Sequence, residues 1–236
     1  MKPIMEAITA VEADTPRLSQ LLPLWEQLLQ HSIAWAGSID TPDCLKVGVV
    51  ESFQRRFNKH EHDSWYAAQG LDPTFAVKDA EGDWRLQLHT MEQDKRDRVV
   101  TLVARLAGTS EDVVDRELMI MELQGLPASM TRALEHLTER GEGTEKMQPA
   151  RQRRGWWRLG DALAMFPSFS EAAIRLLSAH VTTAAAERNW SAWGRLYQGG
   201  QRSRMAIETA AALIYVKGNS TTQQRDDYEI CLDIQE

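Results

Sequence analysis

The densest group of potential metal ligands in this 236-residue chain is His60-Glu61-His62. A protein metal site needs three or four ligands that converge on one point. Histidines two positions apart diverge on a helix, and no third ligand is near them in the sequence. Cys44 and Cys231 are isolated, so neither a zinc site nor a disulfide framework is indicated. We therefore expect an exposed loop around the histidines and a reducing compartment for the cysteines.

A single carboxylate, Glu187, stands near the start of a predicted helix, directly after three alanines. The small neighbours would let a metal ion or another backbone come close. An acid in the first helical turn also compensates the helix dipole, and by itself Glu187 is best interpreted in that structural role. DNA cleavage with two metal ions needs several carboxylates around metals about 3.5–4 Å apart. One carboxylate does not supply such a site.

A series of short motifs surrounds Glu187. In order they are Trp156-Trp157, Phe166-Pro167-Ser168-Phe169, Ala173-Ile174-Arg175-Leu176-Leu177-Ser178, Glu187-Arg188-Asn189-Trp190-Ser191, Trp193-Gly194, Arg202-Ser203-Arg204-Met205 and Leu213-Ile214-Tyr215-Val216-Lys217-Gly218-Asn219. Their order and spacing resemble the C-terminal region of hAT-family DNA transposases. A weaker likeness, from His60 to Pro73, reaches the helical insertion of the same family.

The resemblance implies a role in protein dimerisation. It also implies an RNase H-like core in which two Asp and one Glu bind the Mg²⁺ or Mn²⁺ ions that are used to cut DNA. Glu187 matches the third of these acids. The other two lie on strands upstream of the insertion, and we expect the chain to begin inside the insertion and to lack them. The first prediction is a dimerisation module derived from a hAT-type transposase, without independent catalysis or a cofactor of its own. The alternative is the distal part of an active cut-and-paste transposase, in which Glu187 is a catalytic metal ligand for DNA transposition.

Tryptophans and aliphatic residues of this region are candidates for dimerisation or packing. Stacking on unpaired DNA bases is the other use of exposed tryptophans, but packing is commoner. The candidates are Trp156, Trp157, Leu176, Leu177, Trp190, Trp193, Leu213, Ile214 and Val216.

Basic charge is concentrated in the same region. Residues 146–204 contain ten Lys and Arg and three Asp and Glu, a net charge of +7, whereas residues 1–145 carry −10 and residues 205–236 carry −4. Such a segment suits a surface that faces DNA phosphates, although a solvated linker with scattered arginines explains it equally well. The candidates for DNA contact are Arg151, Arg153, Arg154, Arg188, Arg202 and Arg204. We expect a homo-oligomer in the nucleus, or in the cytosol for a non-functional remnant, with neither a membrane segment nor a small-molecule substrate.

Helical periodicity predicts a mainly α fold. In terms of the resemblance, a helical insertion-like module (1–145) precedes the C-terminal helices of an RNase H-like domain without its sheet strands (146–219) and a polar, disordered tail (220–236). Predicted helices carry apolar stripes over 18–29, 45–57, 99–106, 113–121 and 130–137, and further ones cover 172–178, the segment around 187 and 205–217. Capping boxes are expected at Thr90–Gln93 and Ser168–Glu171, helix ends at Gly108, Gly125 and Gly141, and one short strand between Trp84 and His89.

Overall fold

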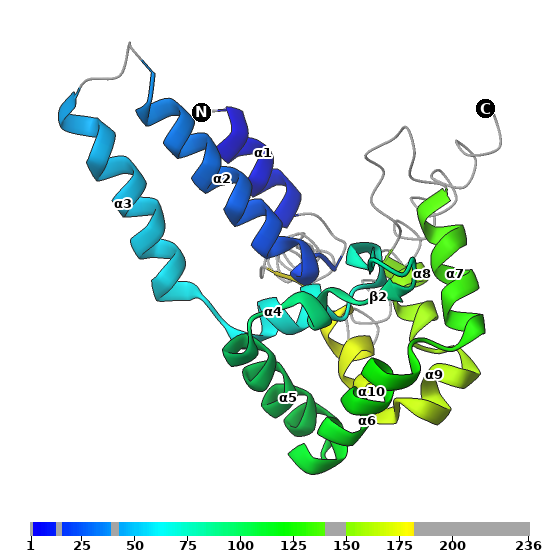
Figure 1. Cartoon of the computed structure of the whole chain (residues 1–236). Helices are drawn as coiled ribbons and strands as arrows, with labels where there is room; N and C mark the ends of the chain where they lie inside the picture. The colour runs from blue at the N-terminus through cyan, green and yellow to red at the C-terminus, as the bar shows by residue number, and fades with distance from the viewer. Residues whose placement is uncertain (1, 13–15, 39–42, 140–149, 182–236) are drawn as a thin grey trace, which may run out of the picture. The chain divides into compact units, whose positions relative to one another are not determined.

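The computed structural model describes residues 2–12, 16–38, 43–139 and 150–181, which belong to one compact unit (Figure 1). The predicted helices around Glu187 and over 205–217, and the tail from 220, lie outside the described residues. The part that is described is mainly helical, as the sequence predicts. None of its helices is long and apolar enough to cross a bilayer.

The described elements are helices with short turns between them and one small hairpin. The helices are α1 (Lys2–Val11), α2 (Leu21–Ala36), α3 (Asp43–His60), α4 (Asp63–Gly70), α5 (Gln93–Ala107), α6 (Glu111–Gln124), α7 (Ala128–Glu139), α8 (Ala150–Trp156), α9 (Gly160–Met165) and α10 (Pro167–Leu176). Single 3₁₀ turns lie at Leu18–Gln20, Pro73–Phe75 and Gln87–Thr90. The antiparallel hairpin pairs β1 (Val77–Lys78) with β2 (Trp84–Arg85). An RNase H-like arrangement stays a prediction.

The observed ends of α5 and α6 can be compared with the capping box and the terminating glycines that the sequence predicts. Gly108 and Gly125 follow these helices with φ of +68° and +72°, as expected for residues that end a helix. The capping box predicted at Thr90 is wrong. Thr90 closes a 3₁₀ turn and donates its hydroxyl to the carbonyl of Gln87 at 2.9 Å, so it is not available to cap α5.

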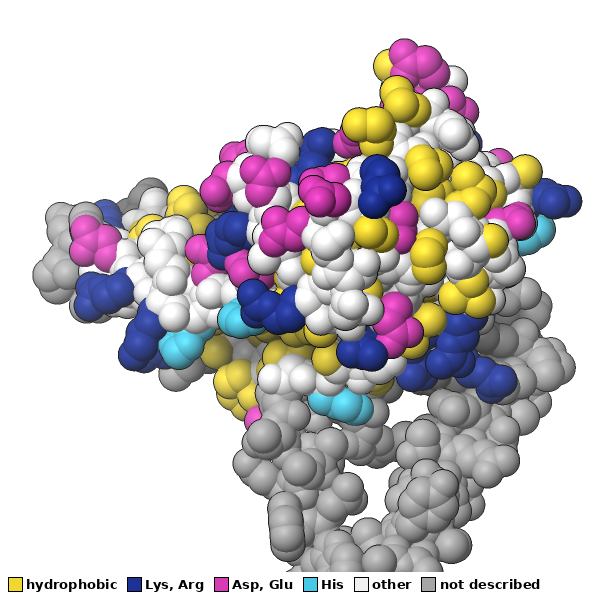
Figure 2. All heavy atoms as spheres, turned by 90° about the horizontal axis from the view of Figure 1, so that it is seen from below, with side chains coloured by type: hydrophobic (Ala, Val, Ile, Leu, Met, Phe, Trp, Pro, Cys, Tyr) yellow, Lys and Arg dark blue, Asp and Glu magenta, His cyan; other side chains and the backbone are white. Residues whose placement is uncertain are grey.

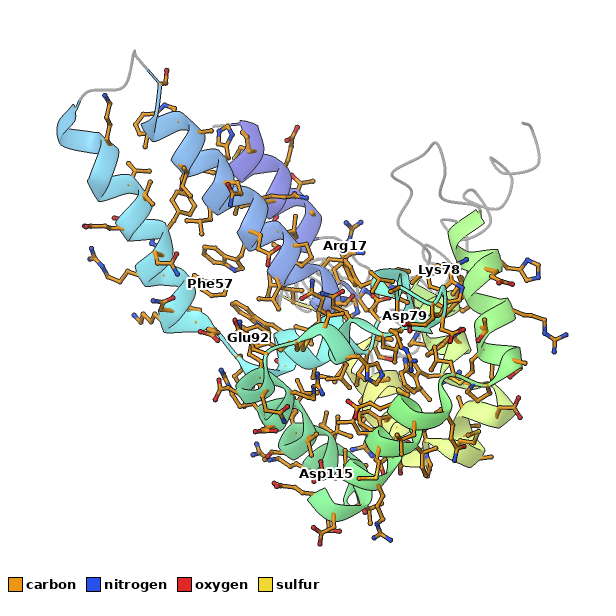
Figure 3. All side chains as sticks on the ribbon, viewed as in Figure 1. Arg17, Phe57, Lys78, Asp79, Glu92 and Asp115 are labelled. Carbon is orange, nitrogen blue, oxygen red and sulfur yellow. The ribbon has the colours of Figure 1, made fainter. Side chains whose placement is uncertain are left out.

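The strand predicted between Trp84 and His89 is shorter in the structure. Only Trp84 and Arg85 pair with β1, and the chain then turns into the 3₁₀ segment. Asp79 fixes the hairpin turn by accepting hydrogen bonds from the amides of Glu81 and Asp83 at 3.1 and 2.8 Å. It also pairs with Arg85 at 2.9 Å, and this contact lowers the pKa of the Asp79 carboxyl (Figure 3).

One hydrophobic core joins residues on both sides of position 145, where the sequence suggests a domain boundary. Its fully buried members include Leu71, Leu86, Val99, Val103, Val114, Met121, Met130, Leu134, Trp157, Phe166 and Phe169. Helix α10 packs against α4, α5 and α6. The helices that follow residue 150 are therefore part of the same packed unit as α4–α7.

α1, α2 and α3 form a group in which α2 packs against both neighbours (Figure 1). Phe57, near the end of α3, lies between Trp25 of α2 and Trp65 of α4, with ring centroids 6.1 and 6.2 Å away (Figure 3). This aromatic contact joins the group of α1, α2 and α3 to the main core. α1 was not among the helices predicted from the sequence.

A polar cluster ties the hairpin to the end of α6. Arg85 donates to the carbonyl of Glu122 at 3.1 Å, and Arg96 of α5 pairs with the Glu122 carboxylate at 2.9 Å. His89 lies 3.6 Å from the same carboxylate, and Arg96 donates to the His89 carbonyl at 2.8 Å. Burial lowers the pKa of His89 below 6.5 and outweighs the opposing effect of Glu122.

Acidification should destabilise the fold partly through His89. The unfolded chain takes up a proton on this residue near pH 6.5, whereas folded His89 does so only at lower pH, so stability is lost as the pH falls below that value. His89→Gln should therefore flatten the decline in the free energy of unfolding between neutral and mildly acidic pH, measured by urea titration. His180→Gln, at an exposed histidine, is the control. Equal pH slopes for wild type and His89→Gln would contradict the prediction.

Candidate functional site

Trp156 and Trp157 lie at the end of α8, inside the core. Their exposed fractions are 3% and 0%, and the rings meet edge to face, 4.9 Å apart and at 89°. The indole N–H of Trp157 donates to the carbonyl of Leu71 at 2.7 Å, and that of Trp156 donates to the carbonyl of Met130 at 2.9 Å. Each tryptophan thus combines apolar burial with a satisfied donor, as buried indoles require. Their place in this structure is packing within one chain.

Arg153 differs from the expectation of a DNA contact. Its side chain is 3% exposed, and Nη1 lies 3.0 Å from Oδ2 of Asp72, whose side chain is fully buried. Ser19 donates its hydroxyl to the same carboxylate oxygen at 2.5 Å, and Arg153 Nη2 donates to the carbonyl of Pro16 at 2.9 Å. The guanidinium is therefore turned into the protein and already paired with a carboxylate.

Asp72 has two roles in this arrangement. Its Oδ1 accepts from the backbone amide and the hydroxyl of Thr74, at 3.0 and 2.7 Å, and so starts the turn at Pro73. Its Oδ2 binds Arg153, a contact that the sequence analysis did not predict. One carboxylate thereby fixes the turn after α4 to α8.

Other arginines lie close to Arg153. Arg151 and Arg158 are exposed, and Arg154 is half-buried and donates to the hydroxyl of Ser178 at 3.2 Å. Burial lowers the pKa of Arg154, and the positive charges of Arg158, Arg153 and Arg151 lower it further. The four guanidinium groups therefore form a basic cluster around α8, of which Arg151 and Arg158 are open to solvent.

The start of α10 is capped by a residue far away in the sequence. Glu117 of α6, only 6% exposed, accepts hydrogen bonds from the amide of Ser168 at 3.0 and 3.1 Å, from its hydroxyl at 2.6 Å and from the amide of Phe169 at 3.3 Å. A carboxylate at this end of a helix satisfies free N–H groups and the helix dipole. The capping box predicted at Ser168–Glu171 is thus wrong, because Ser168 donates to Glu117 while Glu171 pairs with Arg175 at 2.7 Å on the surface.

Replacement of Glu117 should measure the strength of this cap. Glu117→Ala leaves the buried donors of Ser168 and Phe169 without their acceptor, and we expect a loss of about 2–3 kcal/mol in the free energy of unfolding. Urea titration followed by circular dichroism gives the value. Asp115→Ala is the control on the same helix, because Asp115 is exposed and the nearby charges of Asp112, Glu111 and Asp97 repel it. A similar change in both variants would argue against the cap.

The described helices α8–α10 lie in a segment with a recognised counterpart. A family model, the hAT family C-terminal dimerisation region, matches residues 148–220. Residues 148–220 are thus similar to a hAT C-terminal dimerisation region, and we call them the hAT region. No curated protein and no solved structure matches the chain.

Within the hAT region, the described candidates for packing all lie in the core, whereas the described candidates for DNA contact range from buried Arg153 through half-buried Arg154 to exposed Arg151. Leu176 and Leu177 are 6% and 2% exposed and join Trp156 and Trp157 in the core cluster. The remaining candidates lie outside the described residues: Glu187, Arg188, Trp190, Trp193, Arg202, Arg204, Leu213, Ile214 and Val216. Helices α8–α10, the described part of the hAT region, therefore pack against the preceding elements.

The metal-ligand candidates are also accounted for. His60 ends α3 and is exposed, and His62 accepts a hydrogen bond from the amide of Ser64 at the start of α4. Across the described ranges, no group of three or more His, Cys, Asp or Glu is placed to bind a metal ion. Glu187 of the hAT region lies outside those ranges.

Proposed function

We propose that this chain is an assembly module of a hAT-type transposase, which self-associates through its hAT region and has no independent catalytic activity. The match of residues 148–220 to the hAT dimerisation region carries the proposal. The buried contacts of Arg153, Trp157 and Glu117 support it, because they fix the first helices of the hAT region to the rest of the unit. Glu187 is the one acid of the transposase set that the sequence matches, and one carboxylate does not hold two metal ions.

Light scattering coupled to size exclusion tests self-association of the full chain. We expect a dimeric mass at tens of micromolar protein, and a shift toward monomer in Trp190→Asp and in Leu213→Asp. Trp35→Asp is the matched control, because Trp35 is 40% exposed on α2, outside the hAT region. A strictly monomeric wild type would overturn the proposal, and unchanged assembly of both variants would exclude the surface around these two residues.

The basic cluster on α8 supports DNA as a second partner of the module and the nucleus as its location. Arg151, Arg154 and Arg158 gather positive charge at the start of the hAT region, where phosphate groups would relieve their mutual repulsion. Figure 2 shows basic and acidic side chains interspersed over one face of the molecule, so no single sign of charge covers that face. DNA affinity that falls steeply with salt, and falls less steeply in Arg151→Gln/Arg158→Gln, would support this role; absence of binding at low salt would remove it.

The position of Glu187 within the matched residues keeps one alternative open. As the distal part of an active transposase, the chain would supply Glu187 as the third acid of a DNA-cleaving site that uses Mg²⁺ or Mn²⁺. Glu187→Gln should then abolish strand cleavage in a reconstituted transposase while DNA binding persists. Cleavage by the variant would rule this alternative out.

A further inference from the structure

An open apolar groove runs along α2, between α1 and α3. Its volume is about 690 Å³, and its walls are helix side chains from all three elements, among them Ile4, Ile8, Leu24, Leu28, Val49 and Phe53. The described residues that line the groove all belong to α1, α2 and α3, outside residues 148–220. Within the described residues, the groove is therefore distinct from helices α8–α10.

The α1 wall of the groove is only partly covered. Ala7 is 8% exposed and seats α1 on the neighbouring helix, whereas Ile4 and Ile8 are 37% and 41% exposed although both line the groove. The lining positions of α1 are 4, 7, 8 and 11, which is the spacing of one continuous helix face. α1 thus offers an apolar stripe to a partner as well as to α2.

Among the described residues that line the groove, Arg56 on α3 is the one with a charged side chain. It is exposed, and it makes no hydrogen bond or ion pair with any residue that the structure describes. Ser52, the other polar side chain in the lining, is satisfied within its own helix by donating to the carbonyl of Gly48 at 2.6 Å. The groove therefore combines apolar walls with one available cation.

We propose that the groove docks an amphipathic helix of a partner protein that carries an acidic residue. Three or four apolar side chains of this helix lie between α1 and α3, and its Asp or Glu pairs with Arg56. A helix suits the groove because the lining of each wall extends over eight or nine residues, a rise of about 10–12 Å at 1.5 Å per residue. Two turns of a docked helix cover that length, and helices commonly bind such grooves through side chains at i, i+3, i+4 and i+7. Arg56 sets the sign of the charge that the partner brings.

Charge reversal on both sides of the groove tests the proposal with the full chain. The probe is a fluorescein-labelled synthetic helix with leucines at i, i+3, i+4 and i+7 and a glutamate one turn further on, and anisotropy measures binding. Arg56→Glu should weaken binding about fivefold, as for one partly exposed ion pair, and a second peptide with lysine in place of the glutamate should recover the affinity. Arg55→Glu, beside the groove, should leave both affinities unchanged.

The apolar wall is tested by a second matched pair. Ile8→Asp should abolish peptide binding, whereas Met5→Asp, on the same helix and 59% exposed but outside the lining, should not. Because both positions are exposed, we expect both variants to keep the helix content of wild type. Circular dichroism checks this. The proposal is overturned if the glutamate peptide fails to bind, or if wild type binds the lysine peptide as tightly as the glutamate peptide. It is also overturned if dodecanoate quenches the fluorescence of Trp25 while neither peptide binds. The last result would assign the groove to small amphiphiles.

Discussion

Arg153→Met is expected to lower the free energy of unfolding by about 3–5 kcal/mol, as when one partner of a buried ion pair is removed. The change leaves the fully buried carboxylate of Asp72 without its cation and removes the donor to the carbonyl of Pro16. Methionine fills much of the space of the arginine stem, so the loss reflects charge and hydrogen bonding more than volume. Urea titration at one protein concentration, followed by circular dichroism, measures the effect.

Two further variants separate the ion pair from general disturbance of α8. Arg151→Met makes the same change at an exposed position of that helix and should alter stability by less than about 0.5 kcal/mol. In Arg153→Met/Asp72→Asn the uncompensated charge is gone while the side-chain oxygen can still cap the turn, so part of the stability should return. The ion pair would lose its importance if Arg153→Met were as stable as Arg151→Met.

Trp157→Ala is expected to cost about 4 kcal/mol, within the usual range for a fully buried aromatic residue. The indole is 0% exposed, and its N–H is the partner of the Leu71 carbonyl in the interior, so the variant creates both a cavity and an unpaired acceptor. The same urea titration gives the value. This substitution also separates packing from dimerisation, because its effect should be independent of protein concentration.

Trp35→Ala is the control for Trp157→Ala, since Trp35 is 40% exposed and its loss should cost less than about 1 kcal/mol. Trp157→Phe keeps most of the apolar volume but loses the donor, and its stability should lie between those of wild type and Trp157→Ala. A midpoint of unfolding that rises with protein concentration in wild type but not in Trp157→Ala would instead place this residue in the dimer contact.

Local signals in the sequence predicted the middle helices well. The apolar stripe of α5 and the glycines after α5 and α6 have their effect within a few residues, so tertiary contacts did not change the outcome. α1 shows the same spacing, with Ile4, Ala7, Ile8 and Val11 on one face, and periodicity alone could have revealed it.

The capping of α10 could not be predicted by such rules. Ser168 and Glu171 have the spacing of a capping box, but Glu117, 51 residues before Ser168, provides a buried carboxylate that accepts from several donors at once. A long-range contact of this kind prevails over a local exposed one because its charge is shielded from water. The pairing of Asp72 with Arg153 could not be predicted from the sequence either, because no local pattern links two residues that are 81 positions apart.

The long reach of these contacts has a consequence for synthesis on the ribosome. Asp72 emerges 81 residues ahead of the arginine that neutralises it, a wait of about 4–16 s at ordinary elongation rates. During that time the nascent α4–α7 segment exposes apolar surface and backbone carbonyls that α8–α10 cover in the folded structure. The chain should therefore acquire protease resistance late, after residue 177 has left the exit tunnel, and translation products released before position 150 should be substrates for chaperones.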